Sequence, residues 1–388
     1  MILVGIDVAK NKHDCLIINS DGEILVKSFT IPNSLEGFQT LCSKICSCST
    51  NISEIKIGLE ATGHYSNNIA EFLINKNFPV FIINPLHTNL YRKSQSFRKT
   101  KTDKLDTLTI CSMLQTQKLT PYAPVSYHSQ ELKSLTRYRF RLVDECSKLK
   151  VSFNRLMTVI FPELESIVTN IQVNSVYCLM KKYPSAQAIA RCHLTSLTNL
   201  LITNSKGHYR KEKAIIIREV AKSSIGTCTP MQSLELVQTI DRILLLRSQL
   251  TTVEEKIESI MKQLDSPMTT IPGISIQSAA VIYAEIGDFS KFSSAEKILA
   301  FAGMEPSVYQ SGEYNSAHGR MVKRGSKYLR HMLFLAAENV THWDPSFAAY
   351  MTKKRSEGKH YNVAISHVAK KLLRTIYALE EKHQAYQP

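Results

Sequence analysis

Four carboxylates stand out in this sequence by their type and spacing. Asp7 interrupts an otherwise apolar run at the start of the chain, Glu60 ends a second apolar run, and Asp103 and Asp106 lie three residues apart. Carboxylate oxygens are preferred ligands of hard divalent cations, and a pair of such ions can clamp the attacking and leaving oxygens of a phosphodiester. We therefore predict that Asp7, Glu60, Asp103 and Asp106 bind two Mg²⁺ or Mn²⁺ ions. Taken singly, Asp103 could instead interact with a helix N-terminus, and Glu60 could be a solvated strand end.

A candidate nucleophile lies in the second half of the chain. Ser311 is followed by Gly312 in a segment with loop composition, upstream of a strongly cationic stretch. An accessible hydroxyl and nearby cations are what a serine needs to attack a phosphodiester. Ser307, four residues earlier, is an alternative, and a Ser-Gly pair in a loop is otherwise an ordinary turn.

Clusters of lysine and arginine lie near the acids Asp103 and Asp106 and after Ser311. Residues 91–104 contain six lysines and arginines, and residues 320–330 contain five more. A solvated surface would explain such runs, but next to a phosphodiester site they favour phosphate binding. The turn Pro272-Gly273 between two helices predicts a helix-hairpin-helix element whose amides bind phosphate. The predicted nucleic-acid contacts are Arg92, Lys93, Arg98, Lys99, Lys101, Gly273, Arg320, Lys323, Arg324, Lys327 and Arg330.

The acids require a sheet to position them. Residues 1–125 predict strands at 2–8, 14–19, 24–31, 54–60 and 79–84, and helices at 34–46, 65–75 and from about 102. The order β-β-β-α-β-α-β-α is that of the RNase H-like (RuvC-like) fold. It would place Asp7 mid-strand, Glu60 at the end of the adjacent strand, and the other two acids on one helix face.

The remaining chain predicts an all-α organisation, so the whole is α/β plus all-α. Residues 126–265 contain two long helical segments, and seven apolar residues from Ile243 to Leu264 follow a heptad pattern. We expect the two helices to pair as an antiparallel coiled coil, within one chain or between two, and the protein to form a homo-oligomer, either a dimer or a tetramer. The alternative is that the two helices pack inside a monomeric bundle. Residues 266–388 predict a helical domain with the serine loop, and Trp343 is expected in its core.

The composition indicates which kinds of partner the protein binds. The 388 residues include 48 Lys and Arg against 33 Asp and Glu, a net charge of +15, which favours a polyanion. No run of about 20 apolar residues could span a membrane, and the first apolar run lacks the basic leader of a signal peptide. The nine cysteines match no zinc-ligand spacing. We expect a cytoplasmic, nucleoid-associated prokaryotic protein.

Five motifs carry a resemblance to a known family. Gly5-Ile6-Asp7, Gly58-Leu59-Glu60 and Lys101-Thr102-Asp103-Lys104-Leu105-Asp106 resemble the DEDD insertion-sequence transposases related to the Piv DNA invertase. In the second half, Gln310-Ser311-Gly312 and Gly325-Ser326-Lys327 resemble that family's carboxy-terminal domain, although Ser326 stands where asparagine is more usual.

The resemblance implies a recombinase. Magnesium would be bound by the four acids, Ser311 would form a covalent link to DNA, and two subunits would each supply half of a site. A structured bridge RNA would pair with donor and target DNA, and strands would exchange through a Holliday-type junction. Two alternatives remain: a RuvC-like endonuclease or junction resolvase that uses water, and a non-catalytic RNA- or DNA-binding scaffold.

Overall fold

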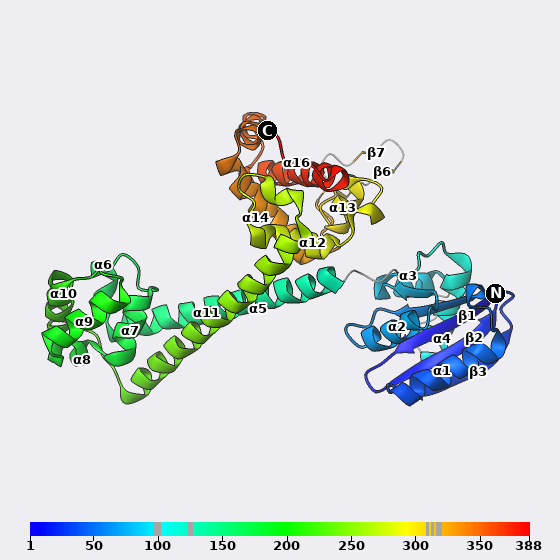
Figure 1. Ribbon diagram of the computed structural model, residues 1–388, viewed down its shortest axis with the longest axis horizontal. Helices are drawn as coiled ribbons and strands as arrows, with labels where there is room; N and C mark the ends of the chain where they lie inside the picture. The colour runs from blue at the N-terminus through cyan, green and yellow to red at the C-terminus, as the bar shows by residue number, and fades with distance from the viewer. Residues whose placement is uncertain (96–101, 123–126, 308–309, 312–313, 316–319) are drawn as a thin grey trace. The chain divides into compact units, whose positions relative to one another are not determined.

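The computed structural model describes the chain except residues 96–101, 123–126, 308–309, 312–313 and 316–319 (Figure 1). The described residues form two compact units, Met1–Pro124 and Val125–Pro388. The first contains a five-stranded sheet and the second is mostly helical, which confirms the α/β plus all-α class. The further division at residue 265 stays a prediction.

The sheet of the first unit has the order β3-β2-β1-β4-β5. β1, β2 and β3 are antiparallel neighbours, and β4 and β5 run parallel to β1. The turn between β2 and β3 contains Asp21-Gly22, and the Gly22 amide donates to the Asn19 carbonyl at 3.1 Å. The strands are β1 (Ile2–Val8), β2 (Lys12–Asn19), β3 (Ile24–Pro32), β4 (Ile55–Glu60) and β5 (Val80–Ile83).

Helices pack on both faces of this sheet. α1 (Leu35–Cys48) and α2 (Ser66–Asn75) bury apolar residues against one face, while α4 (Asp103–Thr116) covers the other through Cys111 and Leu114. The Ser34 hydroxyl caps α1 by accepting the Gly37 amide at 3.2 Å. A short 3-10 helix, η1 (Ile52–Glu54), precedes β4.

One helix of this unit was not predicted. α3 (Pro85–Gln95) forms within what the sequence indicated only as a basic segment. The Asn84 side chain accepts the Leu86 amide at 2.9 Å, and Pro85 in the first helical position needs no amide partner there. The start signal is therefore local, whereas the helix lacks the apolar periodicity that would have revealed it.

Two glycines let α4 lie close to the sheet. A Cβ on Gly5 would come within 2.3 Å of the Thr107 carbonyl oxygen and 2.7 Å of Cys111 Sγ. A Cβ on Gly58, the partner of Gly5 in the register, would come within 2.7 Å of Ile110 Cγ2. The absence of side chains at both positions allows the first turns of α4 to reach the strand ends.

We expect Gly5→Ala to lower the free energy of unfolding by about 3 kcal/mol, because the added methyl group would push α4 away from the sheet. Gly22→Ala is the matched control. A Cβ on Gly22 meets nothing within 4 Å and adds only the strain of a φ of +85°, which costs about 1 kcal/mol. Urea denaturation of both variants measures the difference, and equal losses would refute the close approach of α4.

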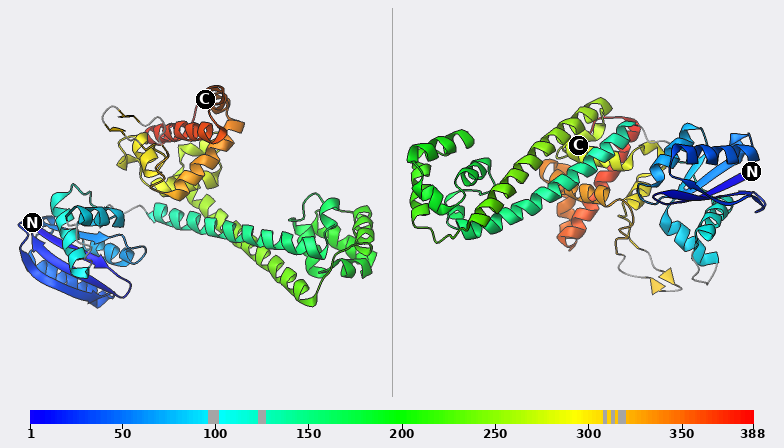
Figure 2. Two further views of the ribbon diagram at one scale, coloured as in Figure 1. Left: turned by 180° about the vertical axis from the view of Figure 1, so that it is seen from behind. Right: turned by 90° about the horizontal axis from the view of Figure 1, so that it is seen from below.

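The second unit is built on two long helices, α5 (Tyr127–Ile160) and α11 (Pro230–Leu264), which run side by side (Figures 1 and 2). Ion pairs join Arg139 to Glu254 and Arg155 to Glu235, so the helices are antiparallel. Five heptad residues are buried within this single chain: Ile243, Leu246, Val253, Ile257 and Ile260. Coiled-coil geometry and self-association stay predictions.

Two groups of helices lie at the opposite ends of this helix pair. One comprises α6 (Leu164–Ile167), α7 (Asn174–Lys182), α8 (Ala186–Arg191), α9 (Leu194–Asn204) and α10 (Lys211–Lys222). The other comprises η2 (Pro267–Thr270), α12 (Ile276–Ile286), η3 (Phe289–Lys291), α13 (Ala295–Phe301), α14 (Lys327–Trp343), α15 (Pro345–Ser356) and α16 (Tyr361–Lys382), with the strands β6 (Gln310–Ser311) and β7 (Tyr314–Asn315).

Trp343 is not a core residue. It ends α14 and is 71% exposed, so its expected burial is wrong. The buried face of α14 is formed by Leu329, Leu333, Ala336 and Val340. Trp343 continues the spacing of this face but is the last residue of the helix, and the packed face ends before it. Among the helices that the structure describes, none is long and apolar enough to cross a membrane.

Candidate functional site

Two of the predicted acids come together at the ends of adjacent parallel strands. Ile6 of β1 pairs with Leu59 of β4, so Asp7 and Glu60 are the next residues along both strands. They follow Gly5 and Gly58 by two residues and therefore lie on the face that α4 covers. Both are partly exposed. Asp7 is the last residue but one of β1, nearer the strand end than the sequence indicated.

The first turn of α4 approaches the same edge. Cys111 and Thr107 lie against Gly5, and the helix continues one turn beyond Thr107 to Asp103. The Thr102 hydroxyl accepts the Leu105 amide at 3.3 Å, so Thr102 rather than Asp103 caps the helix. The structure describes the backbone of Asp103 and not its side chain.

Asp106 has a partner that sequence reasoning missed. It is 4% exposed, and Arg92 of α3 donates to its Oδ1 at 2.9 Å. Arg92 also donates to the Asn89 side chain at 3.3 Å. A residue predicted to bind phosphate thus already neutralises one of the acids. The two lie fourteen residues apart in sequence, and only the packing of α3 on α4 brings them together.

The chemistry of the donor set suits a hard divalent cation. Its members are carboxylates, and Asp7 and Glu60 are neighbours at the edge that the start of α4 approaches. Among the described residues, however, no three His, Cys, Asp or Glu side chains are close enough to hold a metal ion. For Asp106 to bind an ion as predicted, Arg92 would first have to release it.

We expect Arg92→Ala to tighten Mn²⁺ binding to the full chain about three- to tenfold, because a competing cation is removed beside Asp106. The exposed neighbour on α3 provides the control, Lys93→Ala, which should leave the affinity within twofold. Isothermal titration calorimetry measures both. Weaker binding by Arg92→Ala would mean that the guanidinium holds Asp106 in its binding position.

Asp14 is a fifth carboxylate at this edge, and it was missed. It is the register partner of Asp7 across β1 and β2, so both side chains lie on the same sheet face. Thr30 donates a 2.5 Å hydrogen bond to its Oδ1, and the Lys12 ammonium lies 3.2 Å from its Oδ2. The short connection between β1 and β2 could have predicted this position, because a tight hairpin through residues 9–11 sets Asp7 opposite Asp14.

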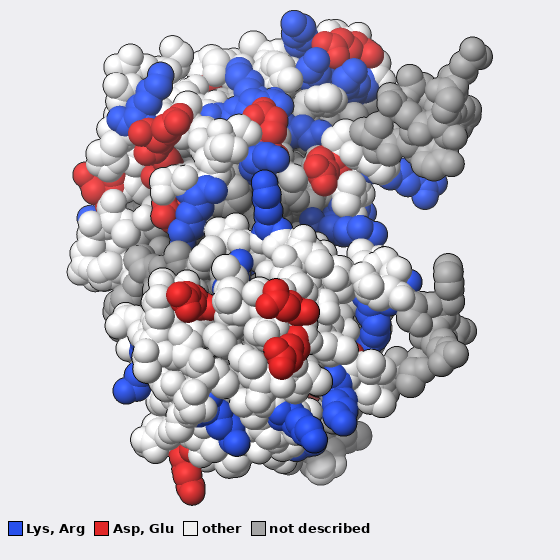
Figure 3. Space-filling model, turned by 90° about the vertical axis from the view of Figure 1, so that its right-hand side faces the viewer, with Lys and Arg blue, Asp and Glu red and all other residues white. Residues whose placement is uncertain are grey.

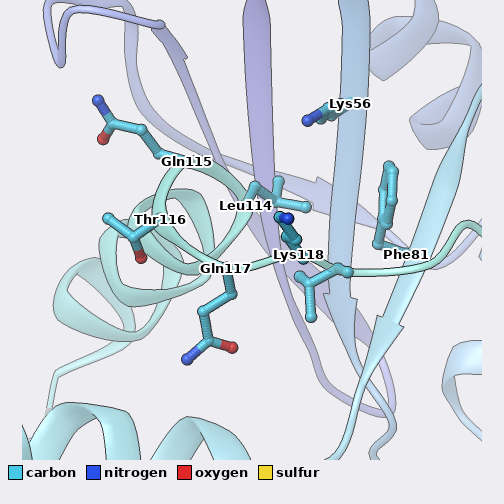
Figure 4. A pocket seen from close by; sticks show the side chains of 8 residues that line it. Lys56, Phe81, Leu114, Gln115, Thr116, Gln117 and Lys118 are labelled. Carbon is cyan, nitrogen blue, oxygen red and sulfur yellow. The ribbon is translucent and has the colours of Figure 1, made fainter.

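A pocket in the first unit lies away from the acids. Its lining includes Lys56 near the start of β4, Phe81 of β5 and the end of α4 around Lys118 (Figure 4). Glu60 is at the other end of β4, and Asp103 at the other end of α4. This pocket therefore does not contribute to the acidic edge.

In the second unit, Ser311 lies on a two-stranded ribbon. Ser311 pairs with Tyr314, and Gln310 with Asn315. Nearer the body of the unit, the Ser307 amide donates to the Arg320 carbonyl at 2.7 Å, and the Val322 amide donates to Glu305 at 3.0 Å. The predicted loop is thus partly paired β-structure. The side chain of Ser311 lies outside the described residues.

Two polar residues of this segment have structural roles. The Ser307 hydroxyl accepts the Arg320 amide at 3.0 Å, so this side chain helps to hold the two arms of the segment together. Arg330 donates to the carbonyls of Ala302 and Lys323 at 2.8 and 3.3 Å. Arg330, predicted to bind nucleic acid, therefore secures the base of the ribbon.

A buried carboxylate holds the start of α14, the helix that follows the ribbon. Glu285 of α12 is 3% exposed and accepts two hydrogen bonds from Arg137 of α5, at 2.7 and 3.1 Å. Ser326 donates to the same carboxylate at 2.7 Å and caps α14 by accepting the Leu329 amide. Burial raises the pKa of Glu285, but the hydrogen bonds from Arg137 and Ser326 outweigh it and leave the pKa lowered.

We expect Glu285→Gln to lower the free energy of unfolding by about 3 kcal/mol at neutral pH, because Arg137 loses its charged partner. A lowered folded-state pKa gives stability that is present above the unfolded value of 4.5 and lost as the pH falls through the folded value. The difference from wild type should therefore shrink below pH 4.5.

Glu296→Gln is the matched control, since Glu296 and its partner Arg374 are both well exposed. Thermal unfolding between pH 3 and 7 checks both variants. A difference for Glu285→Gln that stays constant down to pH 3 would contradict the charged pair.

The other predicted nucleic-acid contacts differ in their surroundings. Arg98, Lys99 and Lys101 lie outside the described residues. The exposed cations are Lys93, Arg320, Lys323, Arg324 and Lys327. Gly273 has a φ of +93°, and a Cβ there would come within 2.9 Å of Val340 Cα in α14. Packing alone therefore accounts for this glycine. Figure 3 shows lysines and arginines spread over the drawn face, with aspartates and glutamates between them.

Comparisons with known proteins match both halves of the chain. Residues 4–162 match the DEDD transposase domain of IS110 elements, and residues 265–352 match the domain described as Transposase IS116/IS110/IS902 family. The pilin gene-inverting proteins of Moraxella bovis and Moraxella lacunata are 24% and 25% identical over 385 residues, covering 99% of this chain and 97% of each relative. The transposase for insertion sequence element IS1111A of Coxiella burnetii is 21% identical over 340 residues, 86% of this chain and 76% of that protein.

Proposed function

The chain belongs to the IS110 family of transposases, and we propose that it cuts and rejoins DNA strands with the acidic edge of its first unit and Ser311 of its second. The observation that carries this proposal is the adjacency of Asp7 and Glu60 at the ends of parallel strands, beside the first turn of α4. We infer that the first unit has an RNase H-like fold, as the strand order β3-β2-β1-β4-β5 suggests.

Asp7, Glu60, Asp103 and Asp106 would hold two divalent ions, Mg²⁺ or Mn²⁺. DEDD transposases use divalent metal ions, which when bound stabilise negative charge on phosphoryl oxygens. The protein supplies the alignment: β1 and β4 fix two carboxylates, and α4 adds the others. Arg92 would release Asp106 as the ions bind and could then face a phosphate.

Ser311 would attack the scissile phosphorus. Its Oγ–P bond forms as one P–O bond of the DNA strand breaks, the hydroxyl proton passes to a base, and the departing oxygen leaves as an alcohol once protonated. The covalent phosphodiester keeps the bond energy, so a second DNA hydroxyl can reverse the step and join a new partner. No outside energy source is required.

The substrate would be donor and target DNA brought together by a structured guide RNA. The proposed assembly is a homo-oligomer, a dimer or tetramer, in which the acids of one subunit serve the serine of another. Exposed cations near the ribbon, including Lys323 and Arg324, would neutralise phosphates there.

Recombination between a donor and a target plasmid tests this function. The purified chain, Mg²⁺ and the RNA transcribed from the ends of the element should yield joined products, detected by amplification across the junction. We expect no product without Mg²⁺ and none without RNA. Product that forms at the full rate without RNA would refute guidance, and hydrolytic nicks without any joining would favour a resolvase.

A further inference from the structure

The helices α7 to α10, which follow the acidic helix α6, carry a concentrated positive charge that the proposed chemistry does not use. Residues 171–230 contain only two acids, Glu212 and Glu219. The same residues contain nine cations: Lys181, Lys182, Arg191, Lys206, Arg210, Lys211, Lys213, Arg218 and Lys222. This excess of seven is almost half of the net charge of the whole chain in less than a sixth of its length.

Most of these cations have no carboxylate to neutralise them. Lys181 pairs with Asp241, and Lys222 pairs with Glu219. The other seven form no salt bridge with any residue that the structure describes. Five of the seven are exposed: Lys182, Arg191, Lys206, Arg210 and Lys211. Unpaired cations at this density attract a polyanion, because bound phosphates release condensed counterions.

A polar groove runs along α9 between two groups of these cations. Its lining consists of five hydroxyl and amide side chains, one lysine, one histidine and one leucine, with no carboxylate: Lys182, His193, Thr195, Ser196, Asn199, Leu200, Thr203 and Asn204. His193 precedes the first residue of α9, and Lys182, the last residue of α7, contacts the first turn of α9 through Ser196. Asn204 ends the helix, and the loop with Lys206 and Arg210 follows directly.

A cation lies beside a tyrosine both before and after α9, and of these residues only Lys182 lines the groove. Before α9, Lys182 Nζ lies 5.5 Å from the centre of the Tyr183 ring, and Tyr183 and Lys182 both contact the Ser196 hydroxyl, at 3.0 and 3.2 Å. After α9, Lys213 Nζ lies 5.9 Å from the centre of the Tyr209 ring. Basic groups interleaved with aromatic rings are typical of nucleic-acid surfaces.

The length and lining of the groove indicate the kind of nucleic acid. An eleven-residue helix is about 16 Å long. A duplex presents several phosphates over that distance, enough to engage cations at both ends. Between them, Thr195, Asn199 and Thr203 offer donors and acceptors to a sugar edge. The 2′-hydroxyl of RNA is both donor and acceptor, and DNA lacks it.

We propose that the groove along α9 binds the sugar–phosphate backbone of double-helical RNA, with Lys182, Lys206 and Arg210 contacting phosphates. This surface lies in a different part of the chain from the acids and Ser311. It deepens the proposed function by giving the RNA a place on the protein, but its binding can be measured without strand exchange.

The experiment compares two triple variants of the full chain that remove the same charge. The test variant is Lys182→Gln, Lys206→Gln and Arg210→Gln. The control is Lys148→Gln, Lys181→Gln and Lys222→Gln, whose lysines already pair with Asp144, Asp241 and Glu219. Fluorescence anisotropy gives the affinity for an RNA hairpin of about 20 base pairs and for a DNA hairpin of matching sequence, each at several salt concentrations.

We expect the test variant to bind the RNA hairpin about 10- to 100-fold more weakly. The slope of the logarithm of the binding constant against the logarithm of the salt concentration should become less steep by about two to three. The control should stay within threefold of wild type, and DNA affinity should change by less than threefold for either variant. Asn199→Ala with Thr203→Val, which keeps the charge, should lower RNA affinity without changing the salt slope.

Three results would overturn the proposal: unchanged RNA binding by the test variant, an equal loss by the control, or an equal loss of DNA binding. Because the readout is binding, failure here leaves strand exchange untouched. Conversely, RNA binding by the groove would survive if recombination assays contradicted the serine mechanism.

Discussion

Ser311→Ala is expected to abolish strand exchange, with joined product falling by a factor of about 10⁴ or more, because no other group replaces a lost nucleophile. The variant should still fold and bind DNA, since Ser311 lies in the two-residue strand β6 and its backbone pairing with Tyr314 needs no hydroxyl. Plasmid recombination with quantitative amplification of the junction measures the loss.

Ser307→Ala, at the base of the same ribbon, is the matched control. The Ser307 hydroxyl accepts the Arg320 amide, so its loss should loosen the ribbon base and reduce joined product by less than about tenfold. Wild-type activity in Ser311→Ala would show the covalent mechanism to be wrong. If Ser307→Ala lost all joined product while Ser311→Ala kept its activity, Ser307 would be the nucleophile.

Asp7→Asn should have the second large effect, a loss of about 10³-fold or more in joined product. The change keeps the size of the side chain but removes a charge at the point where β1 and β4 end together. Higher Mg²⁺ or Mn²⁺ should restore little, because a neutral amide is a poor replacement for a carboxylate ligand. Recombination measured across a metal titration checks both the loss and the lack of rescue.

Asp14→Asn is the control for this variant, since Asp14 lies opposite Asp7 on the same face and is engaged by Thr30 and Lys12. It should lose less than about tenfold. Equal losses would place Asp14 among the metal-binding acids. Full activity in Asp7→Asn would remove the basis for a metal site at this edge.

The strands and most helices could be predicted because their signals are local. Apolar runs marked β1 and β4, the Asp21-Gly22 turn marked the hairpin, and Ser34 marked the start of α1. The adjacency of Asp7 and Glu60 followed from strand order alone, since parallel strands bring their ends to one edge. The repeated apolar pattern of residues 243–264 indicated a long helix with a helical partner but left open whether that partner lies in the same chain; the ion pairs between α5 and α11 show one within it.

The features that sequence reasoning missed depend on tertiary contacts. Arg92 reaches Asp106 only because α3 forms and packs on α4, and α3 lacks the apolar periodicity that predicts a helix. Glu285 and Arg137 are 148 residues apart. Trp343 is exposed although its spacing from Ala336 and Val340 continues the buried face of α14, because the helix ends there. The partners of Arg92 and Glu285 could be found only in the folded chain.

The most direct measurement is the identification of the residue that becomes joined to DNA. Labelled donor DNA is incubated with the chain, Mg²⁺ and RNA, the mixture is denatured, and the trapped protein–DNA adduct is digested and sequenced by mass spectrometry. The proposed mechanism predicts a nucleotide on Ser311, and no adduct in Asp7→Asn. Joined product without any adduct, or a nucleotide on a residue other than Ser311, would contradict it.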